Sequence, residues 1–224
     1  MRSVPISTMP FRPCKKPMVA NYAHNTYCLV RHGEAENNVL GILSSVGSRK
    51  EYALTESGRW VVRSTAEFLK DIAPDFIVAS PILRARESAE IIRDVLAIPL
   101  TIDTRLCEAR FGDFEETNHQ AFIDFMREHG TRAIGAPERG VEGYMDIRER
   151  VRSFLLSTAA AFSGKKIVVV SHADTLQELY AELLGEPIGA EQGDGHWFPE
   201  KGSCLVVTPA SVRSFSPRDG RLGT

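Results

Sequence analysis

The sequence predicts an α/β fold, a three-layer α/β/α sandwich with a mostly parallel central sheet. Strand-like and helix-like segments alternate from Asn25 onward, which is typical of parallel strands joined by crossover helices. The segment "KIVVVS" at 166–171 is a continuous apolar and β-branched run, which indicates a strand buried on both faces. No internal repeat interrupts this pattern, so one domain over residues 25–209 accounts for it.

Five segments are predicted as strands, because each is a short apolar run bounded by polar or turn residues. The first, "TYCLV", ends directly before Arg31, and the central one ends at Ser171. In chain order the predicted strands cover 26–30, 75–80, 99–103, 166–171 and 203–209.

Five further segments carry apolar residues at helical spacing. The second of these helices is predicted to begin at Ser80-Pro81, with serine as N-cap and proline as the first helical residue. The last is closed by Gly185 and Pro187. The helices are predicted over 55–70, 81–96, 120–129, 147–158 and 176–184, with a loop over 135–143.

The two ends of the chain are predicted to be tails. Residues 1–24 combine basic residues with scattered prolines and lack the apolar centre of a secretory signal, so we expect a flexible N-terminal tail. Residues 210–224 are mostly polar and contain glycine, so we expect a loose C-terminal tail.

Composition excludes several classes of function. The 224 residues carry a net charge of −2 with a pI of about 6.3, which argues against a nucleic-acid partner. No apolar run approaches the ~18 residues that a membrane helix needs. The four cysteines lie far apart and form no C-x-x-C pair, so we expect no zinc site and a reduced, cytoplasmic protein.

Charged and titratable side chains follow the predicted strands. Arg31 and His32 follow the first strand, Arg84 lies just past the second, and His172 follows the central one. The segment that contains Glu108 follows the short third strand. Because ligands bind beyond the carboxyl ends of parallel strands, we expect these groups to meet at one edge of the sheet.

Two guanidinium groups, two imidazoles and helix N-termini predict an anion site suited to a phosphoryl group. A bound anion repels a neighbouring carboxylate and so favours the protonated form of that carboxyl group. A protonated carboxyl group can give its proton to a leaving alkoxide. The set therefore predicts phosphoryl transfer with one histidine as nucleophile and Glu108 as acid. Glu115 and Glu116 lie nearby and are alternatives for the acid.

Five motifs in order resemble those of the histidine phosphatase superfamily, whose fold is phosphoglycerate mutase-like. "VRHGEAENN" is similar to the family's R-H-G-E-T-x-x-N motif, with Ala35 in place of threonine. "SPILRARESAE" resembles S-P-x-x-R-A-x-x-T-A, and "VVVSH" resembles the segment that bears the family's second histidine. "LTESGR" and "LCEARFGDFEE" resemble the second motif and the acid segment. The resemblance covers roughly residues 25–209.

The resemblance implies a metal-independent phosphatase that forms phosphohistidine on a small phosphorylated substrate and uses no cofactor. It makes His32 the nucleophile and Glu108 the acid. It implies that Arg31, Arg84 and His172 act on the phosphoryl oxygens and that Asn38 donates a hydrogen bond. Ala173, which stands where the family has glycine, is expected to contact substrate. A homodimer is left open.

Some residues and functions remain open at this stage. Asp174 has Gln177 three residues on, and this spacing favours an N-cap over a ligand. Arg49 and Lys50 are candidates to reach a substrate anion, and Glu34 is expected to orient its loop or the imidazole.

The alternative functions are a phosphoglycerate mutase-type transfer, a non-catalytic phospho-ligand binding module and a metallohydrolase. The last has no H-E-x-x-H spacing to support it. Sugar phosphates, nucleotide-pathway phosphates, phosphorylated acids and phosphoproteins all fit as substrates.

Overall fold

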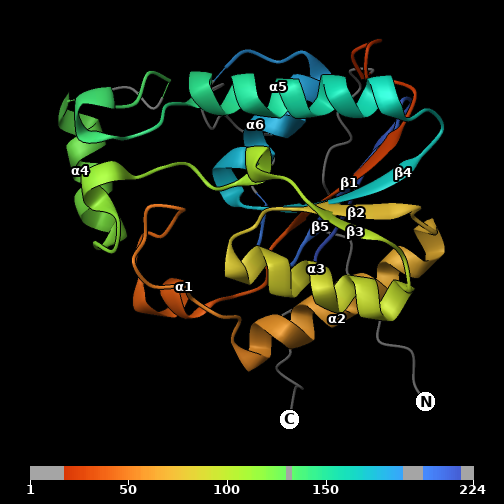
Figure 1. Ribbon diagram of the computed structural model, residues 1–224, viewed down its shortest axis with the longest axis horizontal. Coiled ribbons are helices and arrows are strands. Elements are labelled where there is room, and N and C mark those ends of the chain that lie inside the picture. Colours follow the sequence, from red (N-terminus) through yellow and green to blue (C-terminus); the bar gives the residue numbers. More distant parts are fainter. Residues whose placement is uncertain (1–17, 130–132, 189–198, 218–224) are drawn as a thin grey trace.

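A six-stranded sheet forms the centre of the computed structural model, which describes residues 18–129, 133–188 and 199–217. The strand order is β3-β2-β4-β1-β5-β6 (Figure 1). The first four of these are mutually parallel and β5 is antiparallel to β1, which confirms the mostly parallel sheet. The strands are β1 (Thr26–Arg31), β2 (Phe76–Ala79), β3 (Leu100–Ile102), β4 (Lys166–Ser171), β5 (Cys204–Val207) and β6 (Val212–Phe215).

Helices cover both faces of this sheet and confirm the three-layer sandwich (Figure 1). Helices α2 and α3 lie on one face and α5 and α6 on the other, while α1 and α4 lie at the side. No helix in the described part of the chain is long and apolar enough to cross a membrane. The helices are α1 (Glu36–Leu40), α2 (Glu56–Ile72), α3 (Leu83–Leu96), α4 (His119–His129), α5 (Tyr144–Ala161) and α6 (Ala173–Leu184).

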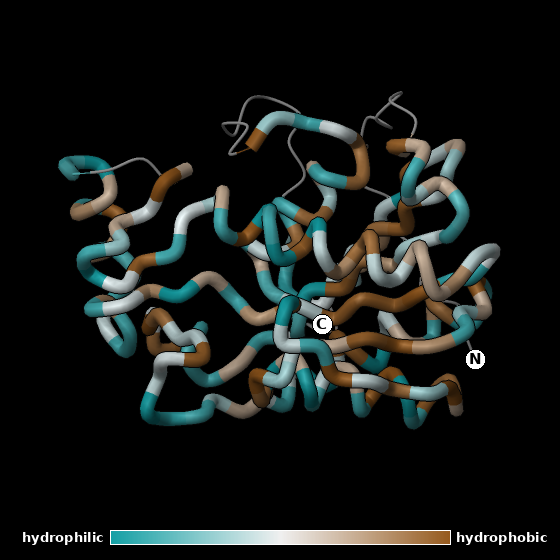
Figure 2. The backbone as a smooth tube through the Cα atoms, turned by 45° about the horizontal axis from the view of Figure 1, so that its top comes forward, coloured by the Kyte–Doolittle hydropathy of each residue, from teal (hydrophilic) through white to brown (hydrophobic). Residues whose placement is uncertain are grey.

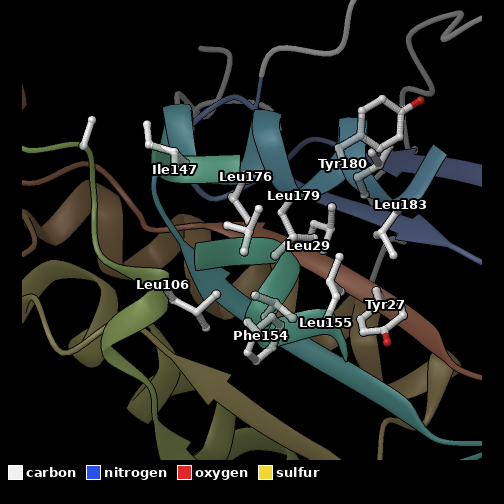
Figure 3. Close-up of a cluster of buried hydrophobic side chains, with 14 of the residues drawn as sticks. Tyr27, Leu29, Leu106, Ile147, Phe154, Leu155, Leu176, Leu179, Tyr180 and Leu183 are labelled. Carbon is white, nitrogen blue, oxygen red and sulfur yellow. The ribbon is translucent and has the colours of Figure 1, made fainter. Parts of the chain in front are cut away.

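The alternation of side chains along the strands produces two cores. On β1, Leu29 points to the side of α5 and α6, where it packs with Leu176 and Leu179 (Figure 3). Its neighbour Val30 points to the other face and packs with the cluster that contains Val62 of α2 and Ile92 of α3. Figure 2 shows the hydrophobic segments along the strands in the middle of the molecule. Burial on both faces therefore holds the central strands in register.

The start of α3 differs from its prediction. The helix begins at Leu83, and Ile82 rather than Ser80 occupies the N-cap position. The Ser80 hydroxyl instead lies 2.8 Å from Nε2 of His172, at the end of the neighbouring strand. A tertiary hydrogen bond has therefore taken the side chain that the local pattern assigns to the helix. Gly185 closes α6 as predicted, in the left-handed region at φ 64°.

Parts of both predicted tails pack against the domain. Met18 and Tyr22 are buried, and the amide of Val19 donates to the carbonyl of Leu183 at 2.8 Å. At the other end β6 pairs with β5, and Phe215 stacks on Phe68 of α2. The packed region thus extends past residues 25 and 209, because apolar side chains on both segments find partners. Residues 1–17 and 218–224 lie outside the described residues.

Candidate active site

The first strand delivers His32 to the carboxyl edge of the sheet through a tightly packed turn. The His32 amide donates to the carbonyl of Ser171 at 3.0 Å, so β1 and β4 end side by side. The next residue is glycine because a Cβ at Gly33 would lie 2.5 Å from the carbonyl oxygen of Gly58 on α2. This close approach fixes the turn, and the side chain of His32 is buried within it.

Hydrogen bonds determine the tautomer of His32. Nδ1 lies 2.7 Å from the carbonyl oxygen of Gly33, which can only accept, so Nδ1 carries the proton. Nε2 accepts from Nε of Arg84 at 3.1 Å. Burial lowers the pKa of His32 well below its usual value, and the charges of Arg84 and Arg31 lower it further. The side chain is therefore a neutral imidazole with its lone pair on Nε2 at neutral pH.

The buried Arg84 and the half-buried Arg31 place their charges near this imidazole. Nη2 of Arg84 donates to the carbonyl of Ser44 at 2.8 Å, so the guanidinium spans from the loop after α1 to the imidazole. Burial lowers the pKa of Arg84 to about 10, which still leaves it charged at neutral pH. Nη1 of Arg31 donates to the carbonyl of Pro199 at 2.8 Å. Both groups place positive charge at the sheet edge.

His172 lies against His32, with 5.1 Å between the ring centroids. Its backbone caps α6, and its Nε2 lies 2.8 Å from Oγ of Ser80. Nδ1 is buried and has no hydrogen-bond partner within the described residues. Burial, followed by the charge of Arg84, lowers the pKa of His172 well below its usual value. This imidazole is therefore neutral as well.

Glu108 is a buried carboxyl beside these groups. Burial and then the carboxylate of Asp174 raise its pKa, the charges of Arg84 and Arg31 oppose the rise, and the resulting pKa is about 7. Its Oε1 accepts from the amide of Ala109 at 3.0 Å. A carboxyl with this pKa is substantially protonated at neutral pH and can give or take a proton there.

The other predicted site residues are placed as follows. Oδ1 of Asn38 accepts from the amide of Ala35 at 3.0 Å, so the side-chain amide group keeps its NH₂ end for other partners. Ala173 is the first residue of α6 and can offer polar contact only through its backbone. Glu34 accepts from the hydroxyl of Thr55 at 3.0 Å and so orients its loop. The N-cap predicted at Asp174 is wrong, because His172 holds that position and Asp174 lies in the first turn.

A loop of serines between α1 and α2 belongs to the site and was not predicted as part of it. Oε2 of Glu115 accepts from the amide of Ser45 at 2.9 Å and from the hydroxyl of Ser48 at 2.8 Å. Oγ of Ser48 lies 3.1 Å from Oγ of Ser44 and accepts its proton, because the Ser48 proton goes to Glu115, and the carbonyl of Ser44 holds Arg84. Glu115 therefore fixes the loop that supports Arg84. The sequence signal was the serine- and glycine-rich run "SSVGS".

A cavity of about 510 Å³ opens beside this loop. Its charged lining consists of Arg49, Arg110, Asp113, Glu115 and Glu116. Arg49 thus faces the cavity, whereas Lys50 pairs with Glu36 at 3.6 Å and lies over the ring of Tyr52. Within the described part of the chain, no group of three or more His, Cys, Asp and Glu side chains is arranged to hold a metal ion.

Comparison with known proteins decides the family. The model of the histidine phosphatase superfamily, branch 1, matches residues 27–208. The chain belongs to this superfamily. An adenosylcobalamin/alpha-ribazole phosphatase of Salmonella typhimurium is 30% identical over 71% of this chain and 79% of its own length. A protein of Erwinia tasmaniensis named "Probable phosphoglycerate mutase GpmB" is 26% identical over 73% of this chain and 77% of its own.

The fold of this chain is also similar to solved structures. The mycobacterial glucosyl-3-phosphoglycerate phosphatase in complex with VO3 has a TM-score of 0.68 and 26% identity, covering 85% of this chain and 96% of that one. The chain is therefore an enzyme of the histidine phosphatase type. The named relatives include both phosphatases and a mutase, so the family alone leaves the fate of the phosphoryl group open.

The raised pKa of Glu108 predicts a pH-dependent stability. In the folded protein the pKa is about 7, above its usual value of 4.5, so stability is fully present below pH 4.5 and is lost as pH rises through 7. Glu108→Gln removes the buried charge and should raise the free energy of unfolding at pH 8 by on the order of 1–3 kcal/mol. The gain should shrink toward pH 5. Urea unfolding at both pH values measures it, with the exposed Glu128→Gln as control.

Proposed function

We propose that this chain is a metal-independent phosphomonoester hydrolase that acts through phosphohistidine on a small phosphorylated metabolite. The observation that carries the proposal is the state of His32. Its Nδ1 proton is held by the Gly33 carbonyl, its Nε2 lone pair faces the buried Arg84, and the charge of Arg31 also acts on it. A neutral imidazole with a fixed tautomer beside charged guanidinium groups suits in-line attack on a phosphorus atom.

The first step transfers the phosphoryl group to the protein. Nε2 of His32 attacks phosphorus as the bond between phosphorus and the leaving oxygen breaks. Arg31, Arg84 and His172 stabilise the charge on the equatorial oxygens, and the NH₂ end of Asn38 and the backbone of Ala173 give further contacts. Since Nε of Arg84 donates to the attacking nitrogen before substrate binds, this donor must turn to a phosphoryl oxygen. Glu108 gives its proton to the leaving oxygen.

The second step returns the enzyme to its starting state. Glu108, now a carboxylate, takes a proton from a water molecule. The water oxygen attacks phosphorus, the bond between nitrogen and phosphorus breaks, and inorganic phosphate leaves. One carboxyl thus serves as acid and then as base, which its pKa of about 7 supports.

The charges around the cavity favour hydrolysis over mutase chemistry. A mutase must hold a doubly charged small acid while the intermediate turns round. Here three carboxylates line the cavity with two arginines, and two further arginines nearby are engaged: Arg139 pairs with Asp113 at 3.1 Å and Arg127 with Asp124 at 3.1 Å. Such a lining is poorly suited to a second anion.

The cytoplasmic location and the homodimer stay predictions.

Loss of the nucleophile should abolish turnover. His32→Ala should lower kcat by at least about 10³-fold, because it removes the nitrogen that forms the covalent intermediate. The measurement is release of phosphate from p-nitrophenyl phosphate. His129→Ala, which removes an exposed histidine of α4, is the control and should keep full activity. Radiolabelled substrate should leave an acid-labile, base-stable adduct on the wild type. A label on serine or cysteine would contradict the mechanism.

Replacement of the acid should matter most for poor leaving groups. Glu108→Gln should cost on the order of 10²–10⁴-fold with an alkyl phosphate and clearly less with p-nitrophenyl phosphate, whose leaving group needs little protonation. Because the acid must be protonated and its pKa is about 7, kcat/KM of the wild type should fall as pH rises above 7. The variant should lose this fall. Equal losses for both substrates would assign the acid to another residue.

The fate of the phosphoryl group separates a phosphatase from a mutase. With 3-phosphoglycerate and a catalytic amount of the bisphosphate, we expect any turnover to release phosphate, with 2-phosphoglycerate as a minor product at most. Product ratios followed by phosphorus NMR measure this. Fast formation of 2-phosphoglycerate with little phosphate would favour the mutase. Binding of phosphorylated compounds with no turnover of any would favour the non-catalytic binding module.

A further inference from the structure

Ser80 occupies a fully buried position directly behind the second histidine. It follows β2, and its Oγ lies 2.8 Å from Nε2 of His172. The same oxygen accepts from the amide of Ile82 at 3.3 Å. The sulfur of Cys107 is another acceptor beside this hydroxyl. Three groups therefore meet at one hydroxyl, and their donors and acceptors limit where its proton can go.

The hydrogen bonds can be assigned by counting donors and acceptors. A serine hydroxyl has one proton to donate and two lone pairs to accept. The Ile82 amide can only donate, so it takes one lone pair. The hydroxyl proton then has two acceptors to choose between, the sulfur of Cys107 and Nε2 of His172, and Nε2 is the stronger acceptor.

The opposite assignment leaves two poor contacts. If Nε2 of His172 carried the proton, the Ser80 hydroxyl would have to donate to sulfur, which is a weak acceptor. Nδ1 would then present a lone pair, and a phosphoryl oxygen brought close to it would be repelled. The buried Nδ1, which has no partner among the residues that the structure describes, suits a donor that waits for an anionic acceptor.

We propose that Ser80 is a positioning residue, whose hydroxyl donates to Nε2 of His172 and so places the imidazole proton on Nδ1, as a donor for the phosphoryl group. The inference rests on the proposed function for its catalytic consequence, but the tautomer itself is a property of the free protein. The two histidines of the site are then held in the same Nδ1–H tautomer for different purposes. His32 keeps Nε2 bare for attack, and His172 keeps Nδ1–H to donate.

The tautomer can be measured without any substrate. ¹⁵N-labelled histidine gives separate signals for protonated and bare ring nitrogens, and the His172 signals are assigned by their loss in His172→Gln. At pH 7.5 we expect a proton on Nδ1 and a bare Nε2. Added inorganic phosphate should shift the Nδ1–H signal more than the Nε2 signal. A proton on Nε2 in the free protein would overturn the proposal, whether or not the protein hydrolyses phosphomonoesters.

Variants test the consequence for turnover. Ser80→Ala should lower kcat for p-nitrophenyl phosphate about 10–100-fold with a smaller change in KM, and its His172 should show a mixture of tautomers. Ser80→Thr keeps the hydroxyl and should retain the Nδ1–H tautomer and most of the activity. Ser157→Ala, which removes the same kind of group from α5 away from the site, is the control and should keep wild-type kcat.

The outcomes separate the tautomer of His172 from the effect of Ser80 on turnover. An unchanged kcat in a folded Ser80→Ala protein would overturn the positioning role. If Ser80→Ala fails to fold, as judged by its thermal transition, the wild-type tautomer still decides the proposal. An Nδ1–H tautomer in a protein that releases no phosphate would support the assignment for Ser80 and contradict the proposed function.

Discussion

Two guanidinium groups at the carboxyl edge of the sheet act on every imidazole and carboxyl group to which the mechanism assigns a role. Arg31 and Arg84 add to the burial that keeps both imidazoles neutral. The same charges limit the rise in the pKa of Glu108, which stays at about 7 and so allows the carboxyl to act in both directions. A buried cation needs acceptors, and Arg84 finds them in Nε2 of His32 and the Ser44 carbonyl.

The surrounding loops are best understood as support for these charges. Glu115 receives hydrogen bonds from the Ser45 amide and the Ser48 hydroxyl, which leaves it poorly placed to act as the acid. Through the hydroxyls of Ser48 and Ser44 this carboxylate is linked to Nη1 of Arg84 by a chain of hydrogen bonds. The electrostatic influence of Glu115 on Arg84 is also attractive. The loop therefore both positions the cation and offsets part of the cost of its burial.

Sequence patterns predicted the sheet and the residues that meet at its edge, because buried parallel strands and strand-end charges are local signals. They did not predict the use of Ser80, since a serine before a proline is equally compatible with a helix cap, and only the fold brings His172 to it. The same holds for Ser45 and Glu115, whose contact joins segments 70 residues apart. β6 and the packing of Tyr22 were missed because short segments near chain ends carry weak periodic patterns.

The strand order has a consequence for synthesis of the chain on the ribosome. β4 lies between β1 and β2 in the sheet, yet it is made after both of them, at residues 166–171. Until it emerges, β1 and β2 have no common neighbour, and their apolar edges stay unpaired. The nascent chain must therefore remain without its central sheet, and without a phosphate site, until about three quarters of it has been translated.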